Sequence, residues 1–357
     1  MASLHSDFLP DATGPIDAVV TWVDGTDPAH RRKRERVLKQ GEYIPEQQRT
    51  LPTGTHTTRF QHSGELFYCL QSIRTFAPWI RRIYLVTDNQ RPDFLDTHPE
   101  LCENLHLVDH TAIFEGYEWA LPTFNSRTIE TALWRIPGLA SRFIYFNDDF
   151  VLTSATHLTD FFRDEGVVLR GTWGQISRFG PVRMWLNDVA TVFAKRALGI
   201  TRSMNHLLQM RSARLAGFND RYFDVPHVPH PLRRDVLQRF FASNEELFEE
   251  NIQHRFRSTD QFSAVYLAHH LEIARGQADT QDPDRATMIN GEMRIPFVLQ
   301  RTLRRIAAGD YTFVCLQGFE NFSDEAQATI KAVLDARMAA STDDDQPTTT
   351  GRQNMSR

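Results

Sequence analysis

Short apolar segments rich in β-branched residues alternate with helical patterns along the first half of the chain, and this alternation constrains the fold most. Strands are predicted for segments 16–23, 83–87, 105–108 and 143–146. Helical patterns at 65–76 and 125–136 lie between them. Strands that alternate with helices form doubly wound sheets, so the sequence predicts an α/β fold with a mostly parallel central sheet.

The rest of the chain has a different pattern. Helical periodicity dominates from 156 to 306, a strand is predicted at 311–316, and a last amphipathic helix begins near Ser323. Residues 41–62 are rich in Gly, Pro, Thr and Gln and predict a long loop of the kind that often binds ligands. The predicted organisation is a disordered start at 1–15, an α/β core at 16–155, a mainly helical insertion at 156–306, a strand and helix that complete the core at 307–339, and a disordered tail at 340–357.

Composition excludes several classes of protein. The chain has 357 residues with 40 Lys and Arg against 45 Asp and Glu, a net charge of −5, which argues against general nucleic-acid binding. The cysteines, Cys69, Cys102 and Cys315, are scattered and predict neither a disulfide framework nor a zinc site. No segment approaches the ~20 apolar residues of a membrane span. We therefore expect a cytoplasmic protein, and peripheral association with the inner face of the cell membrane is compatible with it.

The sharpest local signal is Asn147-Asp148-Asp149, directly after an apolar strand. In open α/β sheets, ligands bind at the carboxyl ends of the strands. Adjacent carboxylates cannot both be buried and charged there without a cation, and carboxylate oxygens suit Mg²⁺. The alternative is a solvated turn in which one of the aspartates caps the next segment.

Two other predicted strands end in polar turns. One turn contains Trp22, Asp24 and Gly25, and the other contains Asp88 and Asn89. Gly25 allows close approach of the backbone to a ligand, and Trp22 either stacks on a base or sugar or belongs to the core. Strand ends in register would bring these turns and the acidic pair into one cleft.

Two segments of the predicted insertion supply cationic groups. His227 lies in the proline-rich segment 226–231, and an imidazole is a general base near neutral pH. Arg257 lies in the segment 254–260, and a guanidinium binds phosphate bidentately. The alternatives are a histidine that stabilises its loop and a basic run that is merely solvated.

Taken together, these segments resemble the four conserved regions of the Stealth family of sugar-phosphate transferases. The first region resembles IDAVVTWVDGTDP at 16–28. The second begins at Arg59-Phe60 and continues through GELFYCLQSI, APWIRRIYLVTDNQ, LVDH and LPTFNSRTIE to FIYFNDDFVL. The third resembles HVPHPLRRDVL and HRFRSTDQFS, and the fourth YTFVCLQGFEN. The resemblance extends from Ile16 to Asn321.

The resemblance implies a fold similar to nucleotide-sugar transferases of the GT-A type, and a reaction. A hydroxyl of a glycan or other acceptor attacks the sugar-proximal phosphorus of a UDP-sugar, such as UDP-N-acetylglucosamine. Sugar-1-phosphate is transferred, UMP leaves, and Mg²⁺ or Mn²⁺ assists, in capsule or exopolysaccharide synthesis. Two alternatives stay open: a GT-A glycosyltransferase that releases UDP, and a nucleotide-sugar-binding protein without catalytic activity.

The resemblance also implies roles for individual residues. Asp148 and Asp149 would hold the metal, His227 would act as general base, and Arg257 would stabilise charge on the transferred phosphate. Positions expected in the donor site are Trp22, Asp24, Gly25, Arg59, Glu65, Asp88, Asn89, Asn125, Ser126, Glu130 and Asn147.

The fourth region departs from the family pattern. Many members have Asn-Asp after the Cys-Leu or Cys-Ile of this region, whereas this chain has Gln317 after Cys315-Leu316. Gln317 is predicted to supply a neutral metal ligand, or Glu320 to restore the carboxylate.

Overall fold

The computed structural model describes residues 14–39, 64–176, 205–258, 260–292 and 296–343. For residues 341–343 it describes the backbone alone. The loop predicted at 41–62, Arg59 and most of both terminal segments lie outside the described residues. In the described part, no helix is long and apolar enough to cross a membrane.

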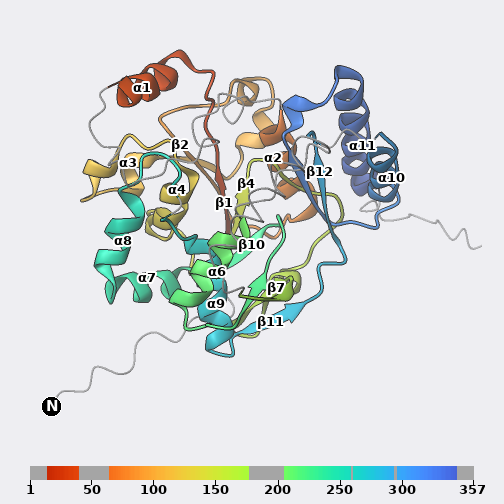
Figure 1. Cartoon of the computed structure of the whole chain (residues 1–357). Helices are drawn as coiled ribbons and strands as arrows, with labels where there is room; N and C mark the ends of the chain where they lie inside the picture. Colours follow the sequence, from red (N-terminus) through yellow and green to blue (C-terminus); the bar gives the residue numbers. More distant parts are fainter. Residues whose placement is uncertain (1–13, 40–63, 177–204, 259, 293–295, 344–357) are drawn as a thin grey trace, which may run out of the picture.

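A five-stranded sheet forms the centre of the molecule, in the order β10-β4-β1-β2-β3 (Figure 1). Its strands are β1 (Ile16–Thr21), β2 (Ile83–Thr87), β3 (Leu105–Asp109), β4 (Arg142–Asn147) and β10 (His230–Arg233). Strands β1 to β4 are parallel, and β10 is antiparallel to β4. The predicted α/β class with a mostly parallel central sheet is therefore confirmed.

Helices cover both faces of this sheet. They are α1 (Pro28–Lys39), α2 (Glu65–Phe76), α3 (His110–Ile113), α4 (Ser126–Ala132), α6 (Asn205–Leu215), α7 (Arg234–Ala242), α8 (Glu245–Ile252), α9 (Ala264–Ala274), α10 (Pro296–Ala307) and α11 (Asp324–Asp343). The helix predicted at 125–136 is shorter in the structure, because a 3-10 turn at Leu133–Arg135 follows α4.

Alternating side chains of β1 belong to two separate hydrophobic cores. Ala18 and Val20 pack in the core that contains apolar residues of α2, α10 and α11. Val19 packs in the core formed with α4, α7, α8 and α9. Successive side chains of a strand point to opposite faces, so the apolar run of β1 is buried on both sides, as expected for a parallel sheet between helices. Figure 1 shows the two groups of helices on opposite sides of the sheet.

The described part of residues 156–306 contains strands as well as the predicted helices. Strands in this segment, besides β10, are β6 (Phe162–Arg163), β7 (Gly166–Arg170), β8 (Thr172–Gln175), β9 (Arg221–Asp224), β11 (Ala278–Gln281) and β12 (Ala286–Asn290). These strands are short, and β11 reads ADTQ, with little apolar character of its own. Its pairing partner is β7, more than a hundred residues earlier, so tertiary pairing overrides the local pattern.

Strand β10 joins the segment 156–306 directly to the central sheet. Leu232 was expected in a helix, but it pairs with Phe143 of β4, and α7 begins only at Arg234. Pro231 has no N–H to donate, which fits an edge strand. Arg233 at the end of β10 forms a buried ion pair with Glu272 of α9, at 2.7 Å. The segment therefore completes the sheet.

A smaller sheet, β12-β13-β5, continues from the acidic turn. Its strand β5 (Phe150–Leu152) follows Asp149 and pairs antiparallel with β13 (Phe313–Gln317), close to the predicted C-terminal strand. The final helix, α11, extends to Asp343 and thus beyond the predicted boundary at 339.

Candidate active site

Three of the polar turns start at one edge of the sheet. Thr21, the last residue of β1, is in register with Asn147 of β4 and Val86 of β2. The turn at 22–25, the turn at 88–89 and the acidic turn at 147–149 therefore leave the carboxyl ends of neighbouring parallel strands. This edge is where open α/β sheets bind ligands.

Asp148 and Asp149 are partly buried carboxylates with incomplete partners. The Oδ2 atom of Asp149 accepts a hydrogen bond from the thiol of Cys315, with a sulfur–oxygen distance of 3.4 Å. Its Oδ1 atom is buried and has no hydrogen-bond partner among the described residues. Desolvation raises the pKa of both groups, and for Asp148 the negative charges of Asp149 and Glu65 raise it further. A cation bound here would remove this electrostatic cost.

Asp149 lies close enough to His227 and Arg257 for their charges to act on it. Burial raises the pKa of Asp149, and the positive charges of His227 and Arg257 oppose that rise. Arg257 donates to the hydroxyl of Ser126 at 2.8 Å. Burial lowers the pKa of Arg257, while Glu130 and then Tyr145 and Asp149 oppose the shift. The fold thus brings the acidic pair to the imidazole and guanidinium that lie on distant segments.

Asn125 organises the segment that carries Arg257. Its side chain is fully buried, and its Nδ2 lies 2.9 Å from the carbonyl oxygen of His254, 3.0 Å from that of Phe256 and 2.8 Å from Oε1 of Gln261. Its Oδ1 caps α4 by accepting from the backbone N–H of Arg127. These contacts show that Asn125 holds the 254–261 loop, and its expected place in the donor site stays a prediction.

Arg127 is a functional candidate that the sequence analysis missed. Its side chain is buried, and it donates to the carbonyl of Ser258 at 2.8 Å. Desolvation lowers the pKa of Arg127 to about 10, and the nearby charge of Arg257 contributes to the shift. The guanidinium groups of Arg127 and Arg257 are therefore close enough for their charges to interact. The sequence feature that could have identified Arg127 is its position two residues after Asn125 in the second region.

Several expected donor-site residues are engaged in the protein itself. Trp22 is only 6% exposed and packs in a hydrophobic core, which favours the core alternative. Burial alone would raise the pKa of Asp88, but hydrogen bonds from His30 and Lys33 of α1 hold it well below its usual range. Asp88 therefore anchors α1 in this structure, and its expected contact with a nucleotide sugar stays a prediction.

The remaining residues of these turns are placed around the same edge. Asp24 is tied to Gln90 through its backbone N–H and carbonyl, both at 2.9 Å, next to the buried Gly25. Asn89 is exposed in a left-handed conformation with φ of 51°. Asn147 accepts from the hydroxyl of Tyr145 at 2.6 Å.

Gln317 and Glu320 lie at the end of β13, but they differ in their relation to the acidic pair. Gln317 accepts from the side chain of Asn290 at 3.2 Å. Burial raises the pKa of Glu320, and the charges of Glu292 and Asp149 add to the rise. Glu320 is thus within electrostatic range of Asp149. Among the described residues, no group of three or more His, Cys, Asp and Glu side chains forms a complete metal site.

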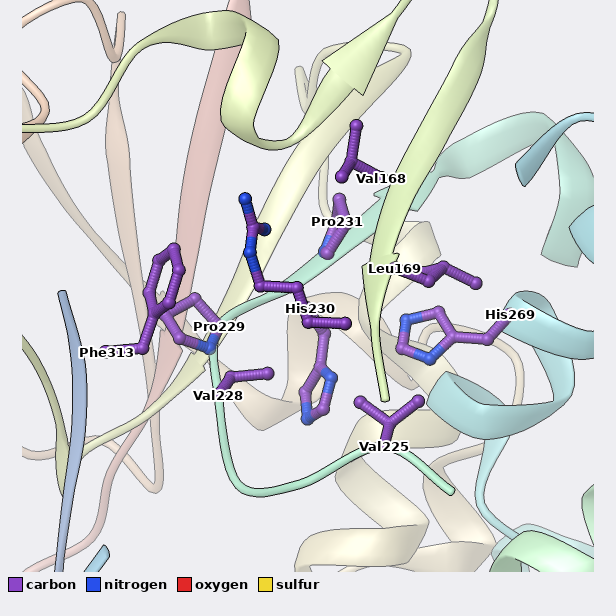
Figure 2. Close-up of a pocket in the computed structure, with 10 residues that line it drawn as sticks. Val168, Leu169, Val225, Val228, Pro229, His230, Pro231, His269 and Phe313 are labelled. Atoms are coloured by element: carbon purple, nitrogen blue, oxygen red, sulfur yellow. The ribbon is translucent and has the colours of Figure 1, made fainter. Parts of the chain in front are cut away.

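A small pocket lies behind the segment that carries His227. Figure 2 shows the imidazoles of His230 and His269 across this pocket, among Val225, Val228 and other apolar side chains. The two rings are 5.2 Å apart between centroids, and Nδ1 of His230 has no hydrogen-bond partner in the described part of the chain. The pocket, of about 10 Å³, has room for about one water molecule. It is too small for a nucleotide sugar.

A larger groove lies beside the 254–261 loop. Its volume is about 570 Å³, within the usual range for ligand sites. The residues that line it are Arg211, Arg214, Leu215, Leu247, Glu250, Asn251, Gln253, His254, Asp260 and Phe262. Arg211 also contributes to the pKa shift of Arg127, so this groove includes a charge that acts on that guanidinium.

The sheet and the residues at its edge are those of an α/β transferase, and comparison with known proteins gives the family. Residues 14–42 match the Stealth protein conserved region 1, and residues 59–169 match conserved region 2. The chain belongs to the Stealth family of bacterial sugar-phosphate transferases.

Curated relatives cover most of the chain. The capsular polysaccharide phosphotransferase WcwK of Streptococcus pneumoniae is 29% identical over 87% of this chain and 92% of its own length. The exopolysaccharide phosphotransferase cps2G of Lactiplantibacillus plantarum is 27% identical over 92% of this chain and 97% of its own length. An exopolysaccharide phosphotransferase of Streptomyces coelicolor is 36% identical, but the match covers only 43% of that protein.

Solved structures that resemble this fold include glycosyltransferases of the GT-A type. The galactosyltransferase LgtC in complex with donor and acceptor sugar analogues is 10% identical and has a TM-score of 0.40, with 90% of this chain and 95% of that chain covered. This likeness concerns the fold alone and carries no argument about substrate or mechanism.

Proposed function

We propose that this protein transfers sugar-1-phosphate from a UDP-sugar to an acceptor hydroxyl, with formation of a phosphodiester and release of UMP. The donor sugar we propose is an N-acetylhexosamine, and the setting is capsule or exopolysaccharide synthesis. Family membership and the phosphotransferase names of its relatives support the reaction class. The proposal depends most on one observation about Asp149, whose buried Oδ1 has no hydrogen-bond partner among the described residues: the carboxylate lies close enough to His227 and Arg257 for their charges to affect its pKa.

A divalent cation, Mg²⁺ or Mn²⁺, fits the residues that are present. Asp148 and Asp149 offer hard oxygen ligands, and burial raises the pKa of both, with the charges of Asp149 and Glu65 adding to the rise at Asp148. We propose that these two residues hold the cation, and that Glu320 or Gln317 completes its protein ligands. When bound, the cation neutralises charge on the diphosphate of the donor.

Separate protein residues accept the proton and stabilise the developing charge in the proposed reaction. The acceptor oxygen forms a bond to the sugar-proximal phosphorus, and the bond from that phosphorus to the bridging oxygen breaks. His227 accepts the proton of the attacking hydroxyl, and the bridging oxygen leaves with UMP. Arg257, supported by Arg127, faces the charge that develops on the transferred phosphate. Positioning and charge neutralisation are the main contributions of a protein to phosphoryl transfer.

The groove beside the 254–261 loop supports a site for the acceptor. Its carboxylates and amides suit hydroxyl groups, and Leu247 offers partly exposed apolar surface for the face of a sugar ring. We propose that a glycan acceptor lies here, on the side of the loop that adjoins Arg127 and Arg257. On the donor side, Asp24, Gly25, Asn89 and the acidic turn remain candidates for contacts with the nucleotide sugar.

Analysis of the leaving group tests this proposal. The full chain is incubated with a panel of UDP-sugars, a glycan acceptor mixture and Mg²⁺, and nucleotides are separated by chromatography. UMP release with a phosphodiester product in mass spectra is expected, and EDTA should abolish it. Stoichiometric UDP would instead identify a glycosyltransferase. Donor binding by calorimetry without turnover in any metal would identify an inactive binding protein.

A further inference from the structure

The fourth region contributes a thiol to the acidic pair. Cys315 of β13 is fully buried, and its sulfur lies 3.4 Å from Oδ2 of Asp149. Oδ1 of the same carboxylate is buried and unpartnered within the described residues. The two oxygens of one carboxylate are therefore unequal: one accepts from the protein and the other does not.

The backbone fixes this contact from both sides. Cys315 pairs with Phe150, the residue after Asp149, in the antiparallel β5–β13 ladder. The N–H of Leu316 donates to the carbonyl oxygen of Asp149 at 2.8 Å. The ladder therefore holds the backbone of Cys315 beside that of Asp149.

We infer that Cys315 is a positioning residue: its thiol holds Oδ2 of Asp149 and so directs Oδ1 toward the ligand of the site. This inference rests on the proposed role of Asp149 as a metal ligand. Carboxylates that bind metals are usually oriented by hydrogen bonds from outside the ligand set, and such partners commonly change affinity by about 10–100-fold when removed.

Cys69 provides a matched control in the same protein. Like Cys315, it is a fully buried cysteine near the acidic pair. Its thiol, however, donates to the backbone carbonyl of Asn147, with a sulfur–oxygen distance of 3.7 Å, and not to a carboxylate. Loss of the Cys69 thiol therefore removes a comparable buried group without releasing Oδ2 of Asp149.

Binding of Mn²⁺ to the full-length chain, measured by electron paramagnetic resonance, tests the inference. Cys315→Val fills the same space without a donor and should raise the Kd for Mn²⁺ by about tenfold or more. Cys315→Ser keeps a donor and should stay within about threefold of wild type. Cys69→Ala should bind as wild type does. Thermal unfolding of each variant shows whether the fold is retained.

The outcomes separate the inference from the proposed function. If Cys315→Val is folded and binds Mn²⁺ as wild type does, while Asp149→Asn abolishes binding, the role of Cys315 is overturned. The metal role of Asp149 then stays intact. Equal binding by wild type and Asp149→Asn overturns the metal role itself, and the positioning role falls with it. If Cys315→Val does not fold, Cys315→Ser provides the test. Binding of Mn²⁺ by Cys315→Ser that is as weak as binding by Asp149→Asn overturns the role of the hydrogen-bond donor at position 315.

Discussion

Asp149 is the residue in which the conflict between stability and function is most direct. Its carboxylate is partly buried beside Asp148, and desolvation is the largest cause of its raised pKa. A group whose folded pKa is raised destabilises the protein above its unfolded pKa. Such strain is retained at sites that await a ligand of opposite charge.

Asp149→Asn should therefore separate stability from activity. It removes one of two like charges, so the free energy of unfolding at neutral pH without metal should rise, by about 1 kcal/mol. Metal-dependent release of UMP should be lost. Urea denaturation and the leaving-group assay measure the two effects, and Asp96→Asn, at an exposed ion pair with Arg91, should change neither. A variant that keeps wild-type turnover would contradict the role of Asp149.

His227 is the proposed general base, and its removal has a distinct kinetic expectation. His227→Ala should lower the rate of transfer by roughly 10²–10⁴, the usual contribution of general base catalysis. Calorimetry should show unchanged binding of UDP-N-acetylglucosamine, since the imidazole acts on the acceptor. Loss of donor binding with the chemical step intact would mean that His227 belongs to the donor site.

At the scale of elements, the start of α4 and the 254–261 loop form one unit. Asn125 caps the helix and contacts three acceptors of the loop, and Ser126, Arg127 and Thr128 add side-chain hydrogen bonds between α4 and the same loop. The loop is therefore positioned by regular structure, although it has little of its own.

Asn125→Ala should impair catalysis indirectly, because Asn125 holds the loop that carries Arg257. Loss of the buried amide should cost about 1–3 kcal/mol of stability, and misplacement of Arg257 should lower kcat by about 10²-fold. The matched control is Asp109→Ala, which removes the cap of α3, where Asp109 accepts from the N–H of Thr111 at 2.9 Å. That variant should lose about 1 kcal/mol of stability and keep its activity. Equal activity of the two variants would show that Asn125 is only a cap.

At the scale of the whole molecule, residues from the second half complete both cores and the sheet. One core includes residues of β13, α10 and α11, and the other includes residues of α7, α8 and α9. Strand β10 covers the edge of β4. The core segment 16–155 by itself therefore lacks part of the helical layer on each side of the sheet.

A fragment that ends at residue 155 should consequently fail to fold alone. It exposes the edge of β4 and the apolar faces that the later helices cover, so we expect no cooperative transition in urea, measured by circular dichroism. The full chain under the same conditions is the control. A cooperative transition in the fragment would show that the predicted domain boundary is real.

Buried histidines make the stability of the whole chain sensitive to acid. Burial lowers the pKa of His230 to about 3, with a further contribution from His227. An imidazole with a lowered folded pKa contributes stability that is complete above its unfolded value of about 6.5 and is lost as the pH falls from there toward about 3.

His230→Phe should reduce this loss. Between about pH 7 and about pH 5, the free energy of unfolding of the variant should fall less than that of wild type, by up to about 2 kcal/mol, measured by urea denaturation. His106→Phe, at an exposed position of β3, should keep the wild-type dependence. Parallel curves for His230→Phe and wild type would contradict the lowered pKa.

The sequence by itself determined the parallel core and the positions where its strands end. Strands β1, β2 and β4 are buried on both faces, so their apolar runs are continuous and stand out from the pattern. The acidic turn after β4 could be located for the same reason. In residues 156–306 the sequence indicates the helices but not the strands, because these strands are short and depend on distant partners, such as β7 for β11.

Only the tertiary structure decided which polar residues meet. Trp22 and Asp88 lie at strand ends as predicted. Trp22, however, packs in a hydrophobic core, and Asp88 forms hydrogen bonds with side chains of α1. Arg127 and Cys315 are not identified as site residues by the sequence alone, and they acquire a role through their places beside Arg257 and Asp149. Local sequence specifies periodicity and turns, whereas desolvation, charge and hydrogen-bond partners arise when residues far apart in the chain are packed together.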